Sequence, residues 1–149
     1  MINENLKLSG QLNIVLRDKD GNIKEERTEK NLVVSAGLTF IASRMKNATA
    51  TAMTHMGLGS GTTNVAAGQT DLVTLLGSRE VLDSTTASSN TIAYVASFEA
   101  GDATGAVTEA GIFNAASGAT MLCRVKFNVV NKAADDTMAV TWTITLSAT

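Results

Sequence analysis

Strict alternation of apolar and polar residues near the C-terminus is the feature that most constrains how this chain folds. Successive side chains of a β-strand point to opposite faces of a sheet, whereas a helix would scatter such a pattern around its circumference. Residues 137–147 therefore predict a strand with one buried face. The apolar side chains on that face are Met138, Val140, Trp142, Ile144 and Leu146.

Three further segments predict strands of the same kind. Residues 121–129 alternate too, and the polar connection 130–136 predicts a hairpin with residues 137–147. Residues 6–17 and 91–98 supply two more alternating segments. The predicted inward residues of 121–129 are Met121, Cys123, Val125, Phe127 and Val129.

An Asp-Lys-Asp-Gly sequence at residues 18–21 predicts a tight turn after the first strand. Asp-Gly favours hairpin turns because both residues tolerate the backbone angles that such turns need. The returning segment, residues 22–29, is rich in charge, which is typical of an exposed edge strand. We therefore expect a hairpin over about residues 6–29 that acts as an arm or an edge contact.

Two short segments predict helices. Ser35 is a candidate N-cap for a helix that would place Leu38, Ile41, Ala42 and Met45 on one face, covering a sheet. A second helix is expected around residues 70–76, with Gly77 ending it. The sequence thus predicts one domain over residues 1–149, mainly β, resembling a β-sandwich or jelly roll with one or two short helices.

Composition excludes several classes of function. The 149 residues carry a net charge of −2, so no basic surface is available for nucleic acid. No apolar run approaches the ~20 residues that span a bilayer, so no membrane contact is expected. The single cysteine, Cys123, excludes an internal disulfide and fits assembly in a reducing cytoplasm. Charged residues make up only 17%, and a surface rich in Thr and Ser is inexpensive to desolvate against another protein.

No catalytic, cofactor or metal site is expected, and the chain is predicted not to be an enzyme. His55 is the only histidine and no nucleophile-elbow pattern accompanies it. The glycine-rich residues 57–63 lack the lysine of a phosphate-binding loop. Asp18 and Asp20 begin like a calcium loop, but a hairpin turn explains them better. Trp142, Tyr94 and Phe98 lie on predicted core faces, which disfavours a carbohydrate-binding or adhesion module.

Four segments of the chain stand out together by their order and spacing. They are NLVVSAGL at 31–38 running into IASR at 41–44, MGLGSGTT at 56–63, TEAGIFN at 108–114 and VTWTI at 140–144. With these segments the chain resembles a group of small structural proteins of tailed bacteriophages. The resemblance spans most of the chain from Asn31 onward, and its motifs are moderately specific.

The resemblance implies a capsid decoration (cement) protein, which binds the outer surface of the shell and stabilises it. Its partners would be the major capsid protein and, as a homotrimer, itself; it would be located on the virion surface after assembly in the host cytoplasm. The alternative is a tail-fibre, tail-tip or baseplate component that takes part in host adsorption. The predicted partner contacts lie in the N-terminal hairpin and the glycine-rich loop: Asp18, Asp20, Lys24, Gly59, Ser60, Thr62 and Thr63.

Overall fold

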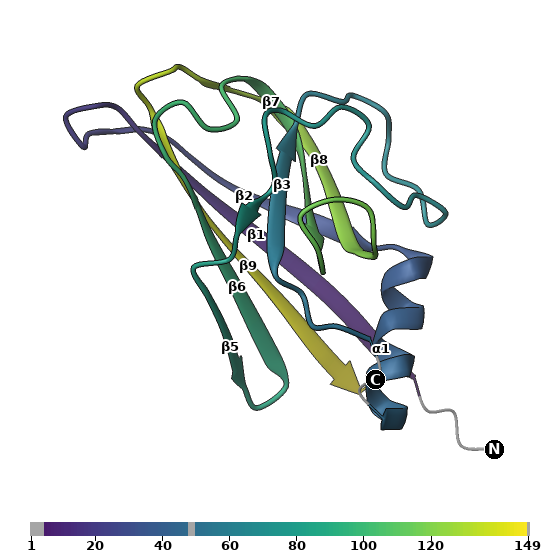
Figure 1. The fold of residues 1–149 in the computed structure, drawn as a ribbon. Coiled ribbons are helices and arrows are strands. Elements are labelled where there is room, and N and C mark those ends of the chain that lie inside the picture. Colours follow the sequence, from purple (N-terminus) through teal and green to yellow (C-terminus); the bar gives the residue numbers. More distant parts are fainter. Residues whose placement is uncertain (1–4, 48–49, 149) are drawn as a thin grey trace.

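The computed structural model describes residues 5–47 and 50–148, and it is mainly β, as predicted. All strands belong to one antiparallel sheet with the order β4-β3-β7-β8-β2-β1-β9-β6-β5 (Figure 1). The single helix of the described residues, α1, spans Ser35–Asn47. The strands are β1 (Leu6–Arg17), β2 (Ile23–Val33), β3 (His55–Gly59), β4 (Glu80–Val81), β5 (Ser84–Ser88), β6 (Thr91–Phe98), β7 (Gly105–Phe113), β8 (Met121–Lys132) and β9 (Thr137–Ala148).

The sheet curls so that its two edge strands approach each other where the chain passes from β4 to β5. The edge strands β4 and β5 are consecutive in the chain, and only Leu82 and Asp83 separate them. Leu82 N–H donates to the Thr54 carbonyl (2.9 Å) on the β3 side, whereas Asp83 N–H donates to the Val95 carbonyl (2.7 Å) of β6. The curled sheet therefore encloses its own core, and the alternation of the strands separates an inner from an outer face.

The inner face carries the core that the alternation predicts. Leu12 of β1, Trp142 of β9 and Tyr94 of β6 lie side by side in register, and all three are buried. Phe98 and Met138 form a neighbouring buried pair. Burying a large apolar side chain contributes about 1.5–3 kcal/mol, so this row is a main source of stability.

Strand β8 departs from the predicted alternation at both ends. Val129 is 43% exposed, and Val130 is buried in its place. Leu122 and Arg124, which the pattern assigns to the solvent face, are also buried. Both faces of β8 are covered in this part of the strand, which a period of two cannot reveal.

The charged part of β2 has a strand partner on one side only, as an edge strand does, although the end of β2 joins the middle of the sheet. The strand pairs with β1 from Ile23 to Asn31, but with β8 only at Leu32 and Val33. In the charged part, Arg27 donates to the carbonyls of Asn128 (2.8 Å) and Val129 (3.1 Å). The prediction of an edge therefore holds for residues 22–29 but not for Leu32 and Val33.

Helix α1 exists where it was predicted, but the predicted packed face is wrong. A Cβ on Gly37 would collide with the Leu122 carbonyl, so this glycine lets the helix approach the backbone of β8. Phe40 and Ile41 consequently pack against the core, while Leu38 and Met45 are 49% and 82% exposed. Close approach at one glycine, rather than the most apolar stripe, sets how the helix is rotated.

The start of α1 also differs from the prediction. Leu38 N–H donates to the Val34 carbonyl (3.1 Å), so Val34 rather than Ser35 takes the cap position. Ser35 N–H donates to the Ala67 carbonyl (2.8 Å) instead. The beginning of the helix thereby holds residues 60–79, the segment between β3 and β4.

That segment contains no helix, and the prediction of one around residues 70–76 is wrong. The chain there is extended and bent, with an isolated bridge between Leu75 and Gly59. Ser60 N–H donates to the Thr74 carbonyl (2.9 Å), and Leu76 N–H donates to the Leu58 carbonyl (2.9 Å). The backbone groups that a helix would have used internally are bonded to the end of β3.

Candidate partner-binding surfaces

The curl gives the sheet two outer faces of opposite character. Over β3, β7 and β8, the segment 60–79 lies across the outer face; we call this the covered face. Over β5, β6, β9 and β1, nothing in the described chain lies on the outer face; we call this the open face. Each could bind a partner only through what it leaves exposed.

A buried ion pair fastens the segment to the covered face. Arg124 Nη2 of β8 donates to Glu109 Oε2 of β7 at 2.9 Å, and both side chains are fully buried. Glu109 Oε1 accepts the backbone N–H groups of Val73 (2.7 Å) and Thr74 (3.3 Å). Arg124 Nη1 donates to the Thr63 carbonyl at 3.0 Å. One carboxylate and one guanidinium therefore hold both halves of the segment.

A glycine, which has no side chain, makes room for this arrangement. A Cβ on Gly61 would overlap Glu109 Oε2, so only glycine admits the carboxylate here. Gly61 contributes its carbonyl as well, which accepts the hydroxyl of Thr108 at 2.7 Å. The glycine-rich residues 57–63 thus serve close packing of the backbone against Glu109.

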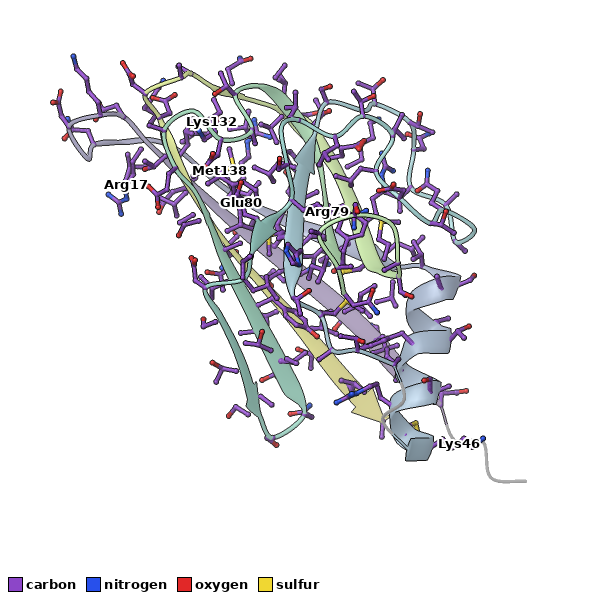
Figure 2. The ribbon with its side chains drawn as sticks, viewed as in Figure 1. Arg17, Lys46, Arg79, Glu80, Lys132 and Met138 are labelled. Carbon is purple, nitrogen blue, oxygen red and sulfur yellow. The ribbon has the colours of Figure 1, made fainter. Side chains whose placement is uncertain are left out.

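A second buried cation holds the end of the segment. Arg79 Nη1 donates to the carbonyls of Ala115 (2.9 Å) and Gly118 (3.0 Å), and Nη2 donates to Asp71 Oδ1 (3.2 Å). Its guanidinium also lies 3.5 Å from the centroid of the Phe113 ring, within cation–π range. Figure 2 shows this side chain beside β3. On the covered face, Glu109, Arg124 and Arg79 are thus engaged in bonds within the chain.

The open face is made almost entirely of small neutral side chains. The outward residues of β5, β6 and β9 include no charged residue, and on β1 only Lys7 and Arg17, near its two ends, are charged. A groove of about 540 Å³ crosses β1 between Lys7, Gln11 and Thr143. The outward residues of β6 and β9 are Thr91, Ala93, Val95, Ser97, Thr137, Ala139, Thr141, Thr143, Thr145 and Ser147.

The predicted contacts of the N-terminal hairpin lie in and next to its turn. Asp18 Oδ1 accepts the backbone N–H groups of Asp20 (2.9 Å) and Asn22 (3.0 Å), and these bonds hold the pKa of Asp18 below 3.8. Lys24 Nζ donates to Asp136 Oδ2 at 2.7 Å, which lowers the pKa of Asp136 in the same way. Asp18 and Lys24 therefore stabilise the hairpin and its contact with the β8–β9 turn, whereas Asp20 offers an exposed carboxylate.

Some of the predicted contacts in the glycine-rich loop are likewise engaged in the fold, and others are exposed. Gly59 is buried at the end of β3. The backbone N–H of Ser60 donates to the Thr74 carbonyl, and the Thr63 carbonyl accepts from Arg124. Thr62 and Thr63 expose their side chains. In Figure 1 the hairpin turn and this loop occupy the same end of the molecule, at opposite corners, with the 99–104 and 133–136 turns between them. We call this surface the turn end.

Two nucleophilic side chains lie inside the fold. Burial raises the pKa of the Cys123 thiol, which keeps it protonated and unreactive. Lys132 Nζ donates to the Glu99 carbonyl at 2.8 Å, and burial lowers its pKa, while the neighbouring carboxylates of Asp102 and Asp136 oppose that shift. Figure 2 places Lys132 at the turn end and Lys46 at the opposite end of the molecule.

The only histidine is held locally. His55 Nδ1 and Thr54 Oγ1 share a hydrogen bond of 2.7 Å at the start of β3. Within residues 5–47 and 50–148, no three His, Cys, Asp or Glu side chains are grouped in a way that could hold a metal ion. In the same part of the chain, no helix has the length and apolarity to cross a membrane.

Sequence reasoning did not single out the open face, although its signal was present. Thr141, Thr143 and Thr145 are the outward members of the alternation that predicted β9. The pattern gives the two faces of each strand, but which outer face stays uncovered depends on where the segment 60–79 lies.

Comparisons with protein-family models, curated proteins and solved structures find no match for this sequence.

Proposed function

We propose that this chain is a structural protein of a tailed-bacteriophage virion, of the capsid decoration type, and that its open face docks on the outer surface of the capsid shell. The observation that supports this most is the neutral outer face of β5, β6 and β9. The class itself is proposed from the resemblance of four sequence segments to phage structural proteins.

The chemistry of the open face suits protein docking. Hydroxyl groups such as those of Thr141 and Thr143 exchange water for partner hydrogen bonds at low desolvation cost, whereas buried charges would cost several kcal/mol each. A standard protein joint buries ~800 Å² per partner. A sheet face built from four strands offers a surface of that order. Many copies on one shell would then act together, because each bound copy clamps neighbouring capsid subunits.

The oligomer proposed with this function is a homotrimer, because local three-fold positions recur on icosahedral shells. In the same proposal, the curled sheet works as a two-layer, jelly-roll-like body, with the open face as one layer and the covered face as the other. The turn end, where Asp20 and Thr62 are exposed, is the alternative surface through which the chain could dock on the shell.

The test is binding to capsid shells from which the protein has been removed. The chain should rebind, and the Thr143→Arg variant should bind at least ten-fold more weakly, since an arginine would be desolvated in the joint. The matched variant Thr62→Arg adds the same charge at the turn end and should bind as the parent does. Absence of rebinding by the parent chain would refute the shell function. If only Thr62→Arg weakens binding, the turn end is the docking surface.

Location in the virion separates the capsid role from the tail-fibre, tail-tip or baseplate alternative. A decoration protein should be found in many copies over the shell. A tail component should be found in few copies at one vertex.

A further inference from the structure

Strand β5 is an edge strand that has none of the usual protection against pairing. All five of its residues, Ser84 to Ser88, are exposed, and none is charged or proline. Its pairing with β6 is continuous over those five residues, without a register shift. An unprotected edge presents unpaired backbone N–H and C=O groups, which form a template for another strand.

The other open stretches of the sheet are protected. The opposite edge, β4, has only two residues, and one of them is the charged Glu80. Where β2 diverges from β8, Arg27 occupies the carbonyls of Asn128 and Val129. Since the fold blocks pairing at these two places, the unblocked edge at β5 is a specific feature of this chain.

We propose that β5 pairs antiparallel with β5 of a second copy of this chain, about a two-fold axis at Thr86. The sequence of β5, Ser-Thr-Thr-Ala-Ser, is nearly the same in both directions. In this register Ser84 faces Ser88 of the second copy, Thr85 faces Ala87, and Thr86 faces its own equivalent. Every cross-strand pair is small and neutral, so the joint has no like charges to repel.

The joint also extends the open face. Thr86 lies beside Ala93 of β6, which lies beside Thr143 of β9, and all three point to the open face. Two copies paired at β5 therefore present one continuous neutral face that crosses the two-fold axis. An isologous joint of this kind connects copies in pairs. It is separate from the proposed trimer and would link neighbouring trimers on a shell.

Five residues per copy bury less than the ~800 Å² per partner of a standard joint, so the contact is weak in dilute solution. Copies held side by side on one surface have a high effective concentration, which strengthens the same contact. This part of the inference rests on the proposed shell function. The pairing itself does not, and purified protein tests it.

Cross-linking with the Thr86→Cys variant tests the pairing directly. Antiparallel neighbours have Cα atoms about 4.5–5.5 Å apart, within the range that a disulfide spans. We expect Thr86→Cys to form a covalent dimer under mild oxidation, at least ten-fold faster than Thr143→Cys, whose residue lies within the open face. The native Cys123 is buried, so it contributes little background. Equal rates for the two variants would overturn the proposal.

The register has its own control. Thr85→Cys should cross-link more slowly than Thr86→Cys, because position 85 faces position 87 of the second copy. A faster Thr85→Cys reaction would contradict the two-fold axis at Thr86.

Sedimentation of the unmodified chain gives a second, independent readout. Its average mass should rise with concentration, and Thr86→Lys should weaken this association at least ten-fold by placing two like charges opposite each other. A mass that does not change with concentration would overturn the pairing, as would association that Thr86→Lys leaves intact. Rebinding of the parent chain to stripped shells is scored separately, so failure of the pairing and failure of the shell function remain distinguishable.

Discussion

The two outer faces of this sheet are built from the same alternating strand pattern, but only one of them is covered by another part of the chain. On the covered face, the outward positions of β7 and β8 hold Glu109 and Arg124, which are fully buried under the segment 60–79. On the open face, the outward positions of β6 and β9 hold threonine, serine and small apolar residues that remain accessible. On the covered face the charges of Glu109 and Arg124 are satisfied within the chain, whereas the open face carries charge only at Lys7 and Arg17 of β1.

This difference separates residues that build the fold from residues that are free to bind. The motifs at 56–63 and 108–114 supply Gly61 and Glu109 to the covered face. The residues of these motifs therefore stabilise the fold. The docking chemistry that we propose lies mostly on other strands, and the following predictions test the separation.

The largest effect is expected from breaking the buried ion pair. Arg124→Ala leaves the Glu109 carboxylate buried without its cation, which should lower the free energy of unfolding by about 3–5 kcal/mol. Thr143→Ala, on the open face, should change it by less than about 0.5 kcal/mol. Urea denaturation measures both. Similar losses for the two variants would remove the distinction between the faces.

The next effect is expected from filling the space that Gly61 leaves for Glu109. Gly61→Ala forces the carboxylate or the segment to move and should cost about 1–3 kcal/mol. Gly68→Ala is the matched control, because a Cβ there meets nothing within 4 Å. Thermal unfolding compares the two. A neutral Gly61→Ala would mean that the segment adjusts freely and is not clamped.

A smaller, pH-dependent effect is expected at the turn end. The bond from Lys24 holds the pKa of Asp136 below its ordinary value of 3.8, so the pair stabilises the fold above that value. The contribution should disappear as the pH falls through the folded-state pKa. Asp136→Asn should therefore destabilise the protein at neutral pH, and this loss should shrink in acid. Asp20→Asn, which removes the same charge from an exposed side chain, is the control and should change the stability at neutral pH by less than about 0.5 kcal/mol.

The smallest effect on stability is expected from charge added to the open face. Thr141→Arg should unfold within about 0.5 kcal/mol of the parent, because the new side chain can remain in water. The same variant should lose shell binding. Circular dichroism and urea denaturation check the first expectation, and a pull-down with stripped shells checks the second. Strong destabilisation would show that the open face contributes to the fold after all.

The local pattern of the sequence was enough to predict most strands. Residues 6–17 and 91–98 became β1 and β6 with the same bounds, since period-two alternation depends only on neighbouring residues. Trp142, Tyr94 and Phe98 lie in the core as expected.

The wrong predictions all involve distant contacts. The helix expected around residues 70–76 is replaced by an extended chain, because Glu109 accepts the N–H groups of Val73 and Thr74 from another strand. The pairing of Leu32 and Val33 with β8 lies beyond the charged residues that predicted an edge, and no local pattern contains it. The rotation of α1 followed from the fit of Gly37 against β8, which no helical periodicity contains.

The candidate site was predictable only in part, for the same reason. Charge and glycine drew attention to the turn end, where Asp18, Lys24 and Gly59 prove to be engaged in the fold. The threonines of the open face could be assigned to a strand face, but not to an uncovered one.

The proposed capsid role is tested most directly by a cryo-electron microscopy map of the phage particle produced where this chain is expressed. We predict density for the curled sheet on the outside of the shell, with capsid protein in contact with Thr141 and Thr143 on the open face. Contact through the covered face, or absence of the chain from the shell, would contradict it.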